Sequence, residues 1–130
     1  MAYAKSKHVG VILWSSWFAF TRDVEDICKK YSEMGVVGFK VDFFDRDDQE
    51  VLRSVYEMSE IAAKYHLLMD YHGFFKPQGL QRTYPNVLNF EGVKGLENVK
   101  WTPDDDVPRY DTSLPFIRQV AGQWIILREP

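Results

Sequence analysis

Carboxylate and imidazole side chains recur at the carboxyl ends of three short apolar segments of this chain. Asp42 lies near the end of the first segment, Asp70 and His72 near the end of the second, and Glu91 ends the third. A positioned carboxylate can act as a nucleophile, transfer a proton or bind a hard cation. Because a buried carboxylate without partners is costly, three segments with this arrangement indicate one common site.

Each of these segments has the alternation of a β-strand, with one apolar face and one face that becomes polar toward the carboxyl end. The predicted apolar faces are Val37, Phe39, Val41 and Phe43 in residues 36–44, Leu67, Met69 and Tyr71 in residues 66–72, and Leu88 with Phe90 in residues 87–91. The predicted opposite faces are Val36, Gly38, Lys40 and Asp42, then Leu68, Asp70 and His72, then Val87, Asn89 and Glu91.

Asp42 is the first candidate for covalent chemistry. Lys40 lies two residues earlier on the same face, and its ammonium would favour the ionised carboxylate that a nucleophile needs. A structural Asp–Lys pair is the alternative interpretation. Trp14, on the same face of its own strand as Gly10 and Ile12, could form a platform for a sugar or belong to the core.

Asp70 and His72 share a face, so they could bind a metal, orient a nucleophile, contact a ligand or form a structural hydrogen bond. Glu91 and Glu97 are separated by a segment with two glycines, which allows the chain to turn and bring both carboxylates together. Hard oxygen donors in such an arrangement suit calcium. The acidic run over residues 45–50 lacks the glycine and distal glutamate of an EF-hand loop, and we expect it to open a helix.

The elements that must position these residues alternate along the chain. Strands are expected at Val9–Trp17, Val36–Phe44, His66–His72 and Val87–Glu91, helices between the first three, and a loop over Gly73–Asn86. The first helix has the apolar stripe Val24, Ile27, Cys28 and Tyr31, and the second has Val51, Val55, Met58, Ala62 and Tyr65. Residues 112–120 are expected to form another short element.

This alternation favours a parallel sheet with crossover helices. An open sheet has helices on both faces and gives no reason for a shared polar face, whereas the interior of a barrel opens to a site at the carboxyl ends of its strands. A complete (β/α)8 barrel needs at least about 200 residues. With 130 residues and four strands, the chain is predicted to be an α/β fold that forms part of a (β/α)8 TIM barrel.

Composition excludes several other classes. The formal net charge of −3 argues against nucleic acid as the main partner, because phosphate binding needs a basic surface. No apolar run approaches the roughly 20 residues of a membrane span, and residues 1–10 lack the apolar stretch of a signal peptide. Cys28 is the single cysteine, so no intrachain disulfide can form, and we expect it to be an inert core residue.

Four segments of the chain resemble glycoside hydrolase family 97, a family of calcium-dependent α-glucosidases and α-galactosidases. They are GVVGFKVDFFDRDDQ (35–49), LLMDYHG (67–73), KPQGLQRTYPNVLNFEGVKGLE (76–97) and LPFIRQVAG (114–122). The resemblance covers residues 9 to about 122, and it implies a catalytic (β/α)8 barrel that lies between two β-domains.

The resemblance also implies roles for individual residues. The inverting branch of the family has a glutamate directly after the strand-end histidine, where this chain has Gly73. The retaining branch has an aspartate nucleophile, which matches Asp42, and its acid/base falls on Glu97. Glu91 matches a calcium ligand, and Glu97 belongs to the same calcium-bearing neighbourhood.

Lys40, Trp14 and His72 are similar to residues that contact the substrate, His72 most clearly. The implied substrates are α-galactosides, with α-glucosides as the alternative, and the implied cofactor is calcium. A non-catalytic remnant that binds sugar or calcium is the other class of function left open.

The resemblance further predicts that residues 1–130 are a fragment of a longer catalytic domain, with an atypical tail over residues 123–130. We expect such a fragment to be inactive alone and to self-associate through exposed sheet edges. Relatives in the family are exported to the periplasm, so a periplasmic location is implied, although no export signal is visible in this chain.

Overall fold

Four parallel strands form one sheet in the computed structural model, which describes residues 1–76, 79–104, 106–118 and 120. The strand order across the sheet is the order along the chain: β1 (Ile12–Ser16), β2 (Gly38–Asp42), β3 (Leu68–Tyr71) and β4 (Val87–Phe90). All three pairings are parallel. The predicted α/β fold with four parallel strands and crossover helices is therefore confirmed.

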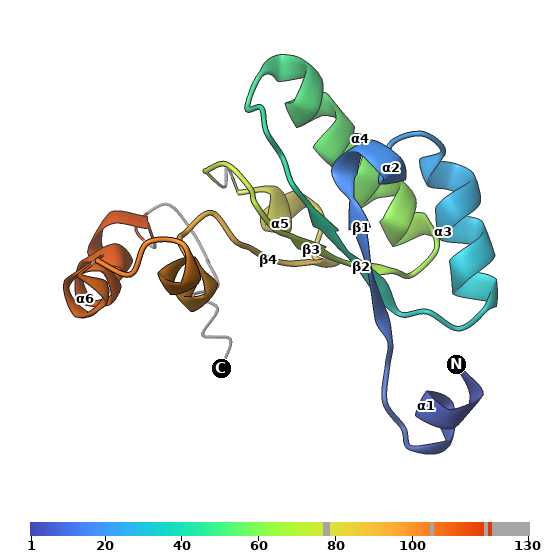
Figure 1. Cartoon of the computed structure of the whole chain (residues 1–130). Coiled ribbons are helices and arrows are strands. Elements are labelled where there is room, and N and C mark those ends of the chain that lie inside the picture. The colour runs from blue at the N-terminus through green and yellow to red at the C-terminus, as the bar shows by residue number, and fades with distance from the viewer. Residues whose placement is uncertain (77–78, 105, 119, 121–130) are drawn as a thin grey trace.

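Helices connect the strands and follow the last one. They are α1 (Ala2–Ser6), α2 (Trp17–Phe20), α3 (Val24–Glu33), α4 (Gln49–Lys64), α5 (Leu80–Thr83), the 3-10 helix η1 (Leu96–Lys100) and α6 (Val107–Arg118). In Figure 1, α3 and α4 lie together on one side of the sheet, and η1 and α6 extend beyond the β4 edge. No described helix is long and apolar enough to cross a bilayer.

The second crossover helix shows how local sequence produces these elements. Asp48 is the N-cap of α4, and its side chain accepts hydrogen bonds from the backbone N–H groups of Glu50 and Val51 at 3.1 and 3.2 Å. The predicted stripe of Val51, Val55, Met58 and Ala62 is buried against the sheet. The acidic run over residues 45–50 thus opens a helix, as expected.

The core lies between the sheet and the two long helices. Phe39, Val41, Met69 and Tyr71 face α3 and α4, and Cys28 is buried in the same cluster. Each large apolar side chain buried in this way contributes about 1.5–3 kcal/mol. The hydroxyl of Tyr71 is paired with that of Ser59 from α4 at 2.7 Å, so this buried polar group is satisfied.

One strand ends earlier than the sequence pattern predicts. Strand β2 stops at Asp42, and Phe43 has a φ of 68°, so the strict alternation breaks there. Phe43 is consequently 57% exposed, and the prediction that it shares the buried face of Val41 is wrong. Phe44 is buried instead, and its ring packs edge-on against Tyr71 and Phe74.

The last strand contains an irregularity that shifts its faces. Val87 pairs with Met69 and Asn89 pairs with Asp70, so Leu88 is an extra residue on β4. Val87 is buried in the core, whereas Leu88 is 39% exposed. The predictions that Leu88 shares the apolar face of Phe90 and that Val87 lies on the opposite face are therefore wrong, although Asn89 and Glu91 keep their predicted side.

Two other predicted segments have different bounds in the structure. The segment predicted as a loop over residues 73–86 contains the short helix α5, and the element expected over residues 112–120 is the longer helix α6, which begins at Val107. The atypical tail over residues 123–130 lies outside the described residues.

Candidate functional site

The strand register brings the predicted polar residues to one face of the sheet. Lys40 of β2 is paired with Trp14 of β1 on one side and with Asp70 of β3 on the other. Asp70 is in turn paired with Asn89 of β4. Since residues in register on parallel strands point to the same side, this row lies opposite the core that α3 and α4 cover.

A cavity of about 260 Å³ lies at the carboxyl ends of β2, β3 and β4. Its lining residues are Lys40, Asp42, Phe43, His72, Gly73, Glu91, Val93, Gly95, Leu96 and Glu97. Five of the six predicted site residues therefore meet around one cavity. Trp14, the sixth, reaches this site through a hydrogen bond to Asp42.

The two oxygens of the Asp42 carboxylate have separate donors. The indole Nε1 of Trp14 donates to Oδ2 at 3.1 Å, and the backbone N–H of Phe43 donates to Oδ1 at 2.7 Å. Among the described ion pairs, none joins Asp42 to Lys40, although both residues line the cavity. Contact with Trp14 was not anticipated, because it depends on how β1 and β2 align.

Gly73 permits the close approach of β3 to this carboxylate. Its φ is +52°, and a Cβ at this position would lie 3.0 Å from Asp42 Oδ1 and 3.2 Å from the backbone nitrogen of Phe43. Both the backbone conformation and the lack of space favour glycine. Any side chain at this position would meet the same crowding.

His72 lies between two carboxylates and is only 3% exposed. Its Nε2 is 3.2 Å from Asp70 Oδ1, and its Nδ1 is 3.6 Å from Glu91 Oε2. These contacts are ionic when the imidazole is protonated. Asp70 Oδ1 is buried and accepts no hydrogen bond of good geometry, so the contact with His72 is its nearest compensation. Asp70 thus faces His72 and does not line the cavity.

Glu91 is positioned by backbone contacts that continue beyond β4. Its N–H donates to the carbonyl of Tyr71, and its carbonyl accepts from the N–H of Phe74, both at 2.7 Å. Its side chain accepts from the N–H of Gly73 at 2.9 Å. Glu97 lies in the first turn of η1, after the two-glycine segment that follows Glu91, and it also lines the cavity.

The donors expected to bind a metal form an incomplete set. Glu91 and Glu97 line the same cavity, and carboxylate oxygens are the donors that calcium prefers. The described residues include no group of three or more histidine, cysteine or acidic side chains that could hold a metal ion. Two carboxylates fit the chemistry of a calcium site but supply only part of the six to eight oxygens that calcium takes.

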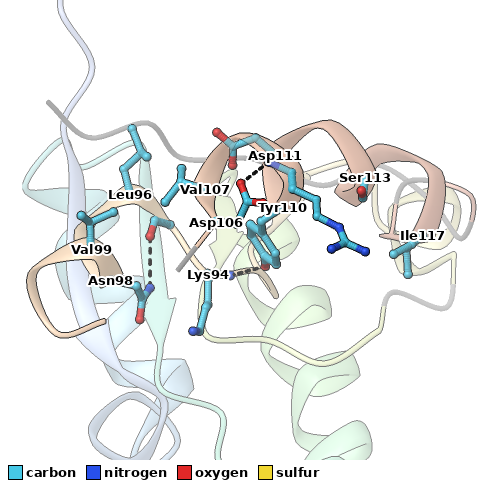
Figure 2. Close-up of a pocket in the computed structure, with 12 residues that line it drawn as sticks. Lys94, Leu96, Asn98, Val99, Asp106, Val107, Tyr110, Asp111, Ser113 and Ile117 are labelled. Carbon is cyan, nitrogen blue, oxygen red and sulfur yellow. Dashed lines mark hydrogen bonds between the residues drawn. The ribbon is translucent and has the colours of Figure 1, made fainter. Parts of the chain in front are cut away.

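A second cavity, of about 540 Å³, lies between η1 and α6 and was not predicted from the sequence (Figure 2). It shares Gly95 and Leu96 with the first cavity. The hydroxyl of Tyr110 on α6 accepts a hydrogen bond from the N–H of Lys94 at 2.8 Å and so ties the two walls together. Neither shared residue carries a reactive side chain, so the two cavities adjoin without a reactive group in common.

Comparison with known proteins identifies the wider group to which this site belongs. The family model of glycoside hydrolase 97 matches residues 1–93 of the chain. A retaining α-galactosidase of Bacteroides thetaiotaomicron is 60% identical over 121 residues, which are 92% of this chain. A probable retaining α-galactosidase of Streptomyces bingchenggensis is 35% identical over 124 residues, or 94% of this chain.

Solved structures support the same fold. A family 97 enzyme of Pseudoalteromonas sp. strain K8, in complex with acarbose, superimposes on 96% of this chain with a TM-score of 0.85 at 23% identity. The chain spans only part of each relative, namely 18% of the Bacteroides protein, 19% of the Streptomyces protein and 22% of the Pseudoalteromonas protein.

Proposed function

The chain belongs to glycoside hydrolase family 97, and on this basis we propose that it carries the two catalytic carboxyl groups of a retaining α-galactosidase. The observation that supports this most directly is the cavity lined by both Asp42 and Glu97. The identity of 60% with a retaining α-galactosidase supports the substrate class. The chain is then one part of a catalytic (β/α)8 barrel, and we expect it to be inactive alone.

Asp42 is the proposed nucleophile. Its carboxylate attacks the anomeric carbon of the galactoside, while Glu97 protonates the departing glycosidic oxygen. This forms a covalent galactosyl–Asp42 ester. Glu97 then removes a proton from water, which attacks the anomeric carbon and releases Asp42. The two displacements together retain the configuration of the sugar.

The other cavity residues bind and orient the sugar. Lys40 presents an ammonium to the cavity, and His72 presents an imidazole held between Asp70 and Glu91. The Lys40 ammonium is a donor that suits the hydroxyl groups of a pyranose, whereas both ring nitrogens of His72 face carboxylates. Trp14 contacts these cavity residues through its hydrogen bond to Asp42.

We propose that calcium completes the site, with Glu91 as the ligand from this chain. A bound cation disfavours protonation of a carboxylate, so we assign the ligand role to Glu91 and proton transfer to Glu97. The remaining oxygens would be supplied by backbone carbonyls, by water or by parts of the protein beyond the described residues. Bound calcium would supply positive charge close to the sugar hydroxyls.

Azide rescue in a full-length host tests the nucleophile. The residues of this chain replace the matching 121-residue segment of the Bacteroides relative, and turnover of an aryl α-galactoside is compared with that of an aryl α-glucoside. Asp42→Ala should lower kcat by several orders of magnitude. Added azide should restore turnover by attacking the anomeric carbon in place of Asp42 and should yield the β-galactosyl azide.

Asp45→Ala is the matched control, because Asp45 follows the same strand but does not line the cavity. If Asp42→Ala keeps near-normal activity, Asp42 is not the nucleophile. Faster turnover of the glucoside would instead assign α-glucosidase specificity. Sugar binding without turnover by the unsubstituted chimera would indicate a non-catalytic remnant.

Calorimetry tests the calcium proposal in the same chimera. Calcium should bind, and Glu91→Gln should weaken binding at least tenfold, because a charged oxygen ligand is lost. Magnesium, which demands a smaller and more rigid site, serves as the control. Equal calcium affinity in the parent and in Glu91→Gln would remove Glu91 from the ligand set.

A further inference from the structure

The indole of Trp14 holds one oxygen of Asp42, and we propose that Trp14 is a positioning residue for the nucleophile and not a platform for the sugar ring. This inference rests on the proposed function, because it requires Asp42 to be the attacking group. It assigns to Trp14 a role that acts through Asp42, whereas the sequence left a sugar platform and a core position as alternatives.

Hydrogen-bond chemistry makes the direction of this contact unambiguous. An indole N–H can only donate, and an ionised carboxylate can only accept. The Trp14 Nε1 to Asp42 Oδ2 distance of 3.1 Å is therefore a hydrogen bond from a neutral donor to a charged acceptor. Hydrogen bonds to a charged group contribute more to stability than hydrogen bonds between two neutral groups.

The second donor explains why one more bond is enough to fix the carboxylate. The N–H of Phe43 holds Oδ1 at 2.7 Å. With this hydrogen bond alone, the carboxylate could still rotate and move Oδ2. The Trp14 bond removes that freedom, since each oxygen then has its own fixed donor. A nucleophile held in one orientation reacts faster, because less orientational freedom has to be lost at the transition state.

The indole is 55% exposed and is supported by its strand and by one neighbouring ring. Strand pairing places Trp14 beside Lys40, and Ser16 beside Asp42, so Trp14 lies on the same face as the carboxylate and one alternation earlier. The ring meets the ring of Phe43 edge to face, with centroids 5.6 Å apart. Phe43 therefore supports the carboxylate twice, through its N–H and through the ring of Trp14.

Hydrogen exchange tests the contact in the chain itself. The indole N–H of Trp14, assigned by its loss in Trp14→Phe, should exchange with D2O faster in Asp42→Ala than in the parent chain. The indole of Trp17, which stacks on Phe44, should be unaffected and serves as the internal control for global opening. Exchange of the Trp14 indole that does not change in Asp42→Ala would overturn the proposal.

Steady-state kinetics of the chimera test whether Trp14 positions the nucleophile. Trp14→Phe keeps an aromatic ring but removes the N–H, so kcat should fall about tenfold with KM unchanged within twofold. Trp17→Phe should leave both constants unchanged. A raised KM with unchanged kcat would assign Trp14 to sugar binding, and unchanged values of both constants would remove it from the mechanism; either result contradicts the proposal.

The two proposals fail in different ways. If Asp42→Ala retains activity, the proposed function is lost, whereas the exchange rate of the Trp14 indole still reports whether the hydrogen bond exists. If Asp42→Ala is inactive and is rescued by azide while Trp14→Phe behaves as the parent, the proposed function stands and the role of Trp14 is refuted.

Discussion

At the scale of single residues, the lack of a side chain at Gly73 permits β3 to lie close to Asp42, the proposed nucleophile. Gly73→Ala should destabilise the fold by more than Gly35→Ala, which should cost about 1–2 kcal/mol for its left-handed backbone alone. Gly35 has a φ of +86° with no neighbouring atom within 4 Å, whereas a Cβ at Gly73 meets Asp42 and Phe43. Urea unfolding of the two variants gives the comparison, and equal losses would show that crowding at Gly73 is relieved without cost.

Cys28 should be chemically silent in the folded chain. Burial raises the pKa of its thiol to about 12, with a further contribution from the charge of Glu25, so almost no thiolate exists at pH 8. Reaction with Ellman's reagent at pH 8 should therefore be slow in buffer and fast in denaturant. A fast reaction in buffer would mean that α3 separates readily from the sheet.

At the scale of elements, one carboxylate joins the two long helices. Glu25 of α3 accepts hydrogen bonds from Lys64 of α4 at 2.5 Å and from the hydroxyl of Tyr65. Both hydrogen bonds lower the pKa of Glu25, and the one from Lys64 has the larger effect. The same contact raises the pKa of Lys64. The side chains of Glu25 and Lys64 are exposed, so salt should weaken the link between them.

The stability of this link should depend on pH in a defined direction. Because the pKa of Glu25 is lower in the folded chain than in the unfolded chain, its contribution is present above the unfolded pKa and is lost as the pH falls through the folded pKa. Glu25→Gln should therefore lower Tm more at pH 7 than at pH 3. Glu33→Gln, on the same helix, is the control and should change Tm little at either pH.

At the scale of the whole molecule, the exposed edges of the described sheet should promote self-association. Strands β1 and β4 are the two edges of the described sheet, and Ile12, Trp14 and Leu88 are exposed apolar residues on these strands. Sedimentation velocity should show larger species as the concentration of the chain rises. Ile12→Lys should shift the distribution toward monomer, and a concentration-independent monomer would contradict this prediction.

The sequence alone determined which residues would meet at the carboxyl ends of the strands. Alternation places Lys40 and Asp42 on one face, and likewise Asp70 and His72. Parallel strands joined by helices align their carboxyl ends. These two local rules predict that Lys40, Asp42, His72 and Glu91 meet, and the two-glycine segment after β4 allows Glu97 to join them at one cavity.

Only the tertiary structure decided the contacts that depend on neighbouring strands. The hydrogen bond from Trp14 to Asp42 follows from the register of β1 against β2, and the extra residue Leu88 follows from how β4 pairs with β3. The turn at Phe43 exchanges its place in the core with Phe44. Alternation within one strand carries no information about lateral register or about where it breaks, because both are set by packing between segments far apart in the chain.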